Sequence, residues 1–349
     1  MDFKDTPEEG AYRAEVRAWL QANGQPRRSA DQVFGEGLDD SAKLAAAKAW
    51  QAKKARAGYA AITWPKEMGG QGGTAMQEVI YKQEEAGYLV PRMIFENSLG
   101  QCLPTIATWA LPELKARHLP KGLAGDEIWC QLFSEPAAGS DTGGIRTRAE
   151  KQGDHWIING QKVWTSGAHF CDYGILLARS DWDKPKQEGL TMFILDMRAP
   201  GVEIRPIHQM SGDSEFNEVF LNDVRIADTH RLGPECGGWK VMLSTLMHER
   251  LAVGGHLPTD LHKILIDVAR KCQWNGQPAI DDARVRAHVA DAFLLQHGVE
   301  LIIARGLTAL SKGKAPGPEM SITKLVAAKA MQDISSFALE LAGPEGALS

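Results

Sequence analysis

The sequence predicts an α+β protein of several domains, helical at both ends and rich in β-strands in the middle. Three observations support this fold class. Residues 1–128 and 237–349 carry apolar residues at helical spacing, bounded by capping residues. Residues 129–236 instead hold short apolar runs separated by turn residues, a spacing typical of a small antiparallel barrel or sandwich. The chain has 349 residues, which is enough for three domains.

The N-terminal helical domain, residues 1–128, is predicted to contain three amphipathic helices, at 8–20, 40–57 and 76–87. Gly24 follows the first helix, and Gly58 can cap the second in a left-handed conformation. The segment between the second and third helices is predicted to be loop.

This loop contains a match to the dinucleotide fingerprint G-x-G-x-x-A, at residues 70–75. The fingerprint requires a hydrophobic strand directly before it. Here Trp64-Pro65 and charged residues precede it. We therefore interpret the match as a turn-rich connector.

The middle domain, residues 129–236, is predicted to be an antiparallel β-barrel. The run 155–164 contains Asn159-Gly160, a pair suited to a type I′ turn, and it is predicted to form a hairpin. Further short strands are predicted at 174–178, 190–196, 202–207 and 218–226.

The C-terminal domain, residues 237–349, is predicted to be helical and to resemble a four-helix bundle. Two long antiparallel helices with short connections are typical of a bundle. The last helix is expected to end at Gly343-Pro344. The helices are predicted at 239–253, 261–272, 282–311 and 318–341.

Composition excludes several classes of protein. The net charge of −5 does not favour nucleic acid or an anionic membrane as a partner. No apolar run approaches the roughly 18 residues of a membrane helix, and the polar N-terminus is unlike a signal peptide. The five cysteines form no Cys-x-x-Cys pair, and the histidines show no metal-ligand spacing. We therefore expect a cytoplasmic protein without a metal site.

The most informative stretch is residues 131–146, together with Trp164-Thr165-Ser166. Small hydroxyl residues and glycines in the first stretch allow a ligand to approach the backbone closely. Trp164 adds a broad aromatic face beside another hydroxyl. Together these residues are suited to a flat ring system with polar edges, such as a flavin.

These motifs carry a resemblance to the FAD-dependent acyl-CoA dehydrogenases, and the resemblance covers essentially the whole chain. One such motif is weak evidence, but five in the same order and at the same separations are strong evidence. The motifs are Trp64-Pro65 with its glycine-rich loop, Ser134-Glu135-Pro136 through Gly139-Ser140-Asp141, Asn159-Gly160-Gln161-Lys162 with Trp164, the run 220–226, and Glu249-Arg250.

The resemblance implies FAD as cofactor and an acyl-CoA thioester as substrate. The implied cofactor-binding residues are Leu132, Phe133, Ser134, Trp164, Thr165 and Ser166. The backbone near Phe133 and the Ser134 hydroxyl would bond the edge of the flavin ring, and Ser166 would bond near the reactive ring nitrogen. Ser140 would face the bound acyl-CoA.

The implied reaction is α,β-dehydrogenation, in which a base removes the α-proton while the β-hydrogen leaves as hydride to the flavin. The base should be a carboxylate in a water-poor pocket, because burial raises its pKa towards the working pH. A Glu-Arg pair in a helix is usually a surface feature. The resemblance nevertheless places the base at Glu249, with Arg250 beside it as a structural or pantetheine contact.

The family's other position for the base lies beyond Ser349. The C-terminal domain is therefore expected to lack its last helices. A carboxylate in a longer tail would compete with Glu249.

Two departures from the family pattern leave alternatives open. The stretch 272–276 lacks the family's Arg and Phe, and the turn 343–346 has Pro and Glu where the family favours Gly and Asn. The main hypothesis is a homo-oligomer, a dimer or tetramer, that serves lipid catabolism and passes electrons to an electron-transfer flavoprotein. A non-catalytic or half-catalytic subunit of a heteromeric dehydrogenase for bulky acyl chains is the second hypothesis. A flavin monooxygenase or oxidase on the same fold is the third.

Overall fold

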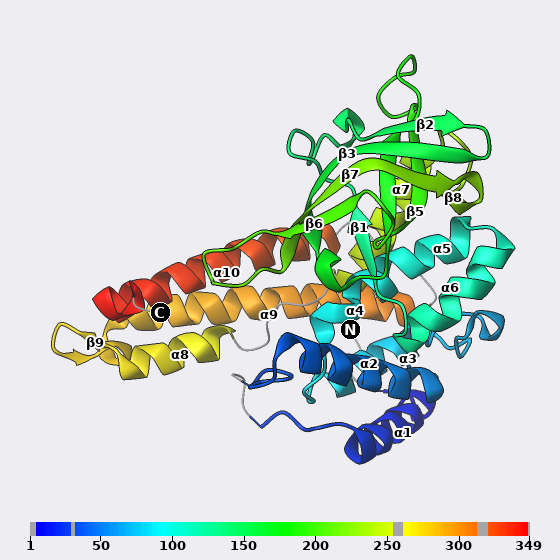
Figure 1. Ribbon diagram of the computed structural model, residues 1–349. Coiled ribbons are helices and arrows are strands. Elements are labelled where there is room, and N and C mark those ends of the chain that lie inside the picture. The colour runs from blue at the N-terminus through cyan, green and yellow to red at the C-terminus, as the bar shows by residue number, and fades with distance from the viewer. Residues whose placement is uncertain (1–4, 29–31, 254–260, 313–319, 348–349) are drawn as a thin grey trace. The chain divides into compact units, whose positions relative to one another are not determined.

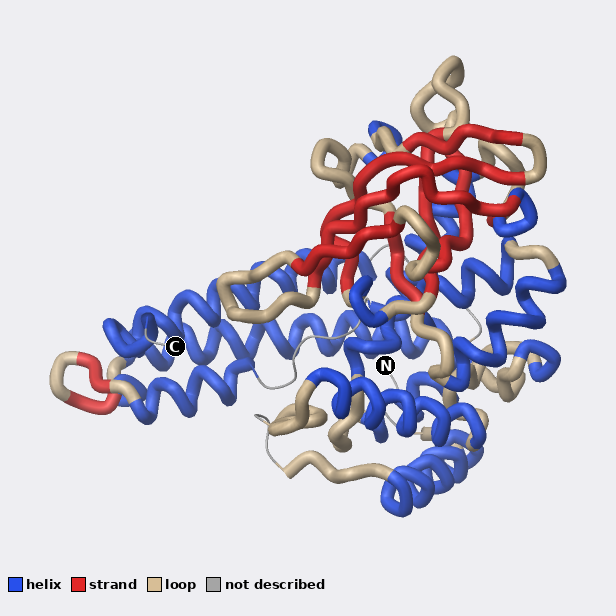
Figure 2. The backbone as a smooth tube through the Cα atoms, in the orientation of Figure 1, coloured by secondary structure: helices blue, strands red, loops and turns tan. Residues whose placement is uncertain are grey.

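The computed structural model describes residues 5–28, 32–253, 261–312 and 320–347 (Figure 1). The chain divides into two compact units. One is Thr6–Ala252, and the other is Met1–Asp5 together with Val253–Ser349. The predicted fold class is confirmed, since a sheet lies between helical segments along the chain (Figure 2). The domain boundaries after residues 128 and 236 stay predictions.

The larger unit begins with helices whose starts are set by side-chain caps. The Thr6 hydroxyl accepts a hydrogen bond from the Glu9 amide, and the Glu9 carboxylate accepts one from the Thr6 amide, so α1 begins with a capping box. Asp39 caps α2 in the same position. The three helices predicted at 8–20, 40–57 and 76–87 are confirmed. The helices before the sheet are α1 (Pro7–Asn23), α2 (Asp40–Arg56), α3 (Ala75–Glu85), α4 (Arg92–Asn97), the π-helix Ser98–Cys102, α5 (Leu103–Trp109) and α6 (Pro112–Ala124).

The glycine-rich segment before α3 is loop, as predicted. Only the short 3₁₀ turn Lys66–Met68 interrupts it among the described residues. A Cβ on Gly70 would lie 2.1 Å from the Trp64 carbonyl oxygen, so glycine is required there by the close approach of backbone.

The sheet follows α6 and is buried on both faces at its centre. The strand order is β6-β7-β3-β2-β4-β5-β8, and β1 pairs with β4. The β1–β4 pairing is parallel, as is a single β2–β4 pair, and the other pairings are antiparallel. Ile175 and Leu177 of β4 pack into one hydrophobic cluster, whereas Leu176 and Ala178 pack into another. The strands are β1 (Trp129–Leu132), β2 (Arg148–Gln152), β3 (His155–Ser166), β4 (Tyr173–Arg179), β5 (Leu190–Asp196), β6 (Val202–Pro206), β7 (Phe216–Ala227) and β8 (Arg231–Leu232).

The predicted hairpin at 155–164 is wrong. Residues 155–166 form one continuous strand, β3, and Asn159-Gly160 lies inside it. A Cβ on Gly160 would lie 2.5 Å from Thr147 Oγ1, so this glycine permits close contact with the neighbouring segment. The Asn159 side chain bonds Asp223 across the β3–β7 pair, where the register shifts. The hairpin that does form here joins β2 to β3.

Helix α7 (Gly238–Val253) follows the sheet, and its buried Val241 and Met242 join the core of the larger unit. The other unit contains α8 (Leu261–Lys271), the small hairpin β9 (Gln273–Trp274) and β10 (Gln277–Pro278), α9 (Ala283–Ser311), α10 (Met320–Ala342) and the 3₁₀ segment Gly343–Ala347. Its helices share one apolar cluster, which includes Leu265, Val285 and Ile334. Among the described helices, none combines the length and apolar character needed to cross a membrane.

Candidate active site

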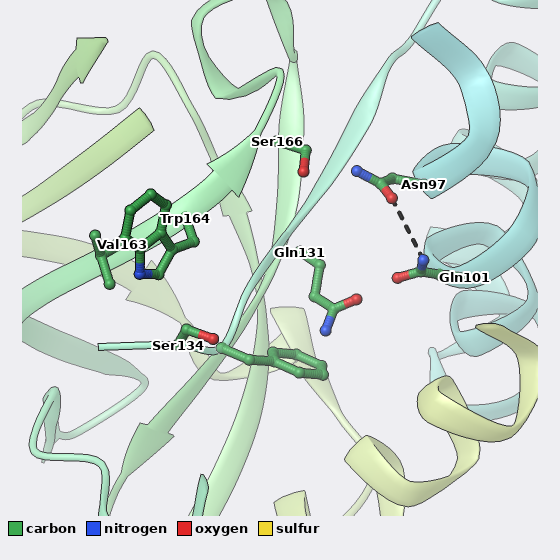
Figure 3. A pocket seen from close by; sticks show the side chains of 8 residues that line it. Asn97, Gln101, Gln131, Ser134, Val163, Trp164 and Ser166 are labelled. Carbon is green, nitrogen blue, oxygen red and sulfur yellow. Dashed lines mark hydrogen bonds between the residues drawn. The ribbon is translucent and has the colours of Figure 1, made fainter. Parts of the chain in front are cut away.

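A pocket of about 200 Å³ lies in the larger unit, between the helices before the sheet and strands β1 and β3 (Figure 3). Two serine hydroxyls, three carboxamides and one indole line it. The lining residues are Asn97, Gln101, Gln131, Phe133, Ser134, Val163, Trp164 and Ser166.

The strand side of the pocket joins two segments about 30 positions apart in the chain. Ser134 follows the end of β1, while Val163 and Ser166 belong to β3. The Val163 amide donates a hydrogen bond of 3.0 Å to the Ser134 carbonyl oxygen, which holds the two segments together. The Ser134 and Ser166 hydroxyls therefore lie in one pocket (Figure 3).

Trp164 has an unusual backbone conformation and an unusually exposed side chain. Its backbone φ angle is +61°, in the left-handed region that residues other than glycine rarely adopt. The register of the β3–β7 pair shifts between Lys162 and Thr165, so Trp164 lies at an irregularity in the ladder. The side chain is 59% exposed, and its ring packs edge-on against that of Phe216 with the ring centroids 5.9 Å apart. The exposed indole is one of the groups that line the pocket.

The helical side of the pocket carries carboxamides. The Gln101 amide nitrogen donates to Asn97 Oδ1 at 3.3 Å, as the dashed line in Figure 3 shows. Gln101 belongs to the π-helix Ser98–Cys102, a distortion that often occurs at functional sites. Gln101 Oε1 is buried and has no hydrogen-bond partner among the described residues. Such an atom is costly to leave unpaired, so a ligand with a polar edge would satisfy it.

The polar groups of the pocket fit a flat ring with polar edges. Within the described parts of the chain, the Ser134 and Ser166 hydroxyls make no hydrogen bond, so both are available to a ligand. The same described residues contain no group of three or more His, Cys, Asp or Glu side chains that could hold a metal ion.

A buried ion pair lies directly behind the strand side of the pocket. Lys162 Nζ is 2.8 Å from Glu135 Oε1, and both side chains are nearly inaccessible. Burial lowers the pKa of Lys162 to about 8, against the attraction of Glu135, which raises it. Burial raises the pKa of Glu135, but the Lys162 ammonium and hydrogen bonds from residues 146 and 147 outweigh it, so the net direction is down.

The predicted site residues fall into three groups. Phe133, Ser134, Trp164 and Ser166 line the pocket together. Leu132 and Thr165 are buried next to them but are not lining residues, and Ser140 is exposed outside the pocket. Glu249 and Arg250 lie in α7, and their side chains are outside the described part of the structure. The roles of all these residues stay predictions.

Four lining residues were missed by sequence reasoning: Asn97, Gln101, Gln131 and Val163. Gln131 is the first residue of the stretch 131–146 and lies two positions before Phe133. Side chains two positions apart in a strand point to the same face, so Gln131 could have been predicted from Phe133. Asn97 and Gln101 carried no local signal, because only tertiary packing brings their helices to β1.

The sequence matches one protein family along almost its whole length. Residues 6–126 match the N-terminal domain of acyl-CoA dehydrogenase, residues 130–224 match its middle domain, and residues 237–349 match its C-terminal domain. The chain is also 33% identical over 350 residues to acyl-CoA dehydrogenase IpdE1 of Mycolicibacterium smegmatis, covering 96% of this chain and 86% of that protein. The chain belongs to the acyl-CoA dehydrogenase family. Its members are FAD-dependent oxidoreductases that act on CH–CH bonds, and the prediction of an enzyme of this class is confirmed.

Other relatives differ in length and assembly. The chain is 33% identical over 350 residues to acyl-CoA dehydrogenase FadE34 of Mycobacterium tuberculosis, covering 97% of this chain and only 47% of that protein. Among solved structures, the ChsE4-ChsE5 complex from Mycobacterium tuberculosis matches with a TM-score of 0.77 and 28% identity, covering 100% of this chain and 88% of that chain. The structure described as the Tcur3481-Tcur3483 steroid ACAD matches with a TM-score of 0.78 and 26% identity, with the same coverage.

Proposed function

We propose that this chain catalyses the α,β-dehydrogenation of an acyl-CoA thioester to the trans-2-enoyl-CoA, with FAD bound in the pocket described above. One observation carries the proposal. The Ser134 and Ser166 hydroxyls and the exposed Trp164 indole, from segments far apart in sequence, line the same pocket. When bound, FAD supplies the hydride acceptor, which no side chain can replace.

The residues of the pocket bind and orient the ring in this proposal. Ser134 and the backbone at Phe133 bond its polar edge, and Ser166 bonds near the reactive nitrogen. Trp164 covers part of the ring with its aromatic face. Gln101 Oε1, which is buried and unpaired among the described residues, adds an acceptor on the helical side.

We assign α-proton removal to Glu249, which lies in α7 directly before Arg250. The resemblance of this Glu-Arg pair to the family motif supports the assignment. The α-proton of a thioester is a weak acid, so hydrogen bonds to the thioester carbonyl must stabilise the developing enolate. Arg250 is proposed to contact nearby structure or the pantetheine arm. Ser140 is proposed to face the acyl-CoA, and its exposed position leaves it accessible.

The test is an anaerobic titration of the FAD-loaded protein with straight, branched and steroid-like acyl-CoAs, followed by the visible flavin band. Bleaching by one class establishes dehydrogenation and names the substrate. Glu249→Gln should abolish rapid bleaching while FAD still binds. Glu188→Gln, at an exposed position, is the matched control and should bleach like the wild type. Bound FAD without bleaching by any acyl-CoA would rule out a self-sufficient dehydrogenase.

A second candidate function is one subunit of a heteromeric dehydrogenase for bulky acyl groups. Support comes from the matched structures that are described as a ChsE4-ChsE5 complex and as a Tcur3481-Tcur3483 steroid ACAD. The stretch 272–276, which lacks the family's Arg and Phe and contains β9 and the turn to β10, adds support. Under this proposal the chain forms a complex of higher native mass when a related chain is added. Bleaching of the flavin band by acyl-CoA then requires that related chain. Transfer of electrons to an electron-transfer flavoprotein, and a cytoplasmic location, belong to either proposal.

A further inference from the structure

The ammonium of Lys162 lies entirely in the protein interior, directly behind a residue that lines the pocket. It donates to the Phe133 carbonyl oxygen at 3.0 Å and to Glu135 Oε1 at 2.8 Å. Phe133 and Glu135 are the two chain neighbours of Ser134. One ammonium therefore holds the chain on both sides of Ser134.

The Glu135 carboxylate extends this anchor to a third segment. Its oxygens accept hydrogen bonds from the Arg146 amide at 2.6 Å and from the Thr147 amide at 2.9 Å. Both oxygens are thereby used, and the carboxylate joins the end of β1 to the start of β2. The pair therefore joins three segments, namely the residues after β1, strand β3 and the residues just before β2.

The ion pair also reaches Trp164 through the backbone. Lys162 is two residues before Trp164 in β3, and the Val163 amide between them donates to the Ser134 carbonyl oxygen at 3.0 Å. Ser134 and Trp164 both line the pocket. Residues 133 and 134 are thus tied through their carbonyl oxygens to Lys162 and Val163, and Glu135 is tied through its carboxylate to Lys162 and to the residues just before β2.

We propose that Lys162 is a positioning residue for the flavin site, in which its ammonium, paired with Glu135, fixes the backbone on both sides of Ser134 and keeps Ser134 and Trp164 in register. The inference rests on the proposed function, because the group positioned is FAD. A fully buried ammonium is costly, and an apolar side chain of similar volume would avoid that cost. Only a donor, however, can hold the Phe133 carbonyl oxygen in place.

The experiment separates positioning from stability with two variants. Lys162→Met leaves Glu135 buried without its partner and should unfold at a lower temperature. The double variant Lys162→Met with Glu135→Gln removes both charges, so it should melt above Lys162→Met but below the wild type, because a carboxamide at position 135 can accept from only one of the Arg146 and Thr147 amides. Its dissociation constant for FAD should nevertheless rise about tenfold, because no donor holds the Phe133 carbonyl oxygen.

The matched control is Glu127→Gln, which alters another buried pair of the same unit. Glu127 Oε2 lies 2.8 Å from His118 Nδ1, and neither residue lines the pocket. This variant should lose stability while its dissociation constant for FAD stays within about twofold of the wild type. A double Lys162 variant that is folded and binds FAD as tightly as the wild type would overturn the proposal.

Amide hydrogen exchange of the FAD-free protein gives a second readout. Exchange in peptides that contain residue 163, whose amide donates to the Ser134 carbonyl oxygen, should be faster in the double variant than in the wild type or in Glu135→Gln alone, and unchanged in Glu127→Gln. Unchanged exchange in the double variant would also overturn the positioning role. If the wild type itself does not bind FAD, the proposed function fails, and the exchange data still decide whether Lys162 orders the backbone around Ser134.

Discussion

The hydroxyl oxygens of Thr105 and Thr245 lie 2.9 Å apart in the interior of the larger unit, although 140 positions separate them in the chain. Thr105 also contacts the Gln101 carbonyl oxygen at 2.7 Å, and Thr245 contacts the Val241 carbonyl oxygen at 3.0 Å. The two hydroxyl groups have only two hydrogens for these three contacts, so one hydrogen is shared between two acceptors. The pair joins the helical wall of the pocket to α7, the helix that contains Glu249.

Replacing Thr245 with Val should lower the free energy of unfolding by about 1–2 kcal/mol, because a buried hydrogen bond is lost. A double-mutant cycle with Thr105→Val should give a coupling energy of about 1 kcal/mol. Thr108→Val is the control, since Thr108 makes the same kind of bond to Pro104 on an exposed surface. It should cost less than about 0.5 kcal/mol. Urea denaturation measures all of these, and a coupling energy of zero would contradict the structural role of the pair.

Gly160→Ala should destabilise the sheet. The added Cβ would meet Thr147 Oγ1 at 2.5 Å and Thr147 Cα at 2.7 Å, and the backbone atom cannot move aside cheaply. Overpacking of this kind costs about 1–3 kcal/mol. The control Gly139→Ala has no atom within 4 Å of the new Cβ and should be nearly neutral. Equal melting temperatures for the two variants would argue against the close β2–β3 approach.

Trp164→Ala should weaken FAD binding with little effect on folding. The side chain is 59% exposed, so its loss removes little buried area, whereas stacking on an aromatic ligand is worth about 0.5–1.5 kcal/mol beyond area. The dissociation constant for FAD, measured by flavin fluorescence, should rise about three- to tenfold. Trp182, which is 56% exposed and lies outside the pocket, provides the control. If Trp182→Ala weakens binding as much, the pocket is not where FAD binds.

The acid stability of the protein should depend on Glu135. Its pKa in the folded state is below the usual value, because the effect of Lys162 and of hydrogen bonds exceeds that of burial. The unfolded chain therefore binds more protons at acid pH, so stability is present above about pH 4.3 and is lost as pH falls through the folded-state pKa.

Between pH 6 and pH 3.5, the free energy of unfolding of the wild type should fall more steeply than that of Glu135→Gln. The variant is expected to be less stable at neutral pH, since it leaves Lys162 without its carboxylate. The comparison therefore concerns the slope with pH and not the absolute value. Parallel slopes would mean that the Glu135 pKa is not lowered by folding.

Much of the fold was predictable because its signals are local. The capping box of Thr6 with Glu9 sets the start of α1, and the run of apolar residues at 190–196 forms β5 as predicted. The strand side of the pocket was also predictable, since Ser134 and Trp164 belong to recognisable motifs. The helical side was not, because Asn97 and Gln101 reach the pocket only through packing of the π-helix against β1.

The dipeptide Asn-Gly shows where local signals stop being sufficient. At Asn275-Gly276 both residues have positive φ, 53° and 79°, and they form the two-residue turn between β9 and β10. At Asn159-Gly160 the same dipeptide lies inside β3. The helical and β segments, the family and the motif residues could be inferred from the sequence, because helix periodicity, caps and motif spacing are properties of neighbouring residues. Which Asn-Gly pair forms a turn depends on tertiary structure, because pairing with β7 and contact with Thr147 keep Asn159-Gly160 extended. The position of Lys162 beside Ser134 depends on it too, because the bonds to Phe133 and Glu135 join residues that are distant in the chain.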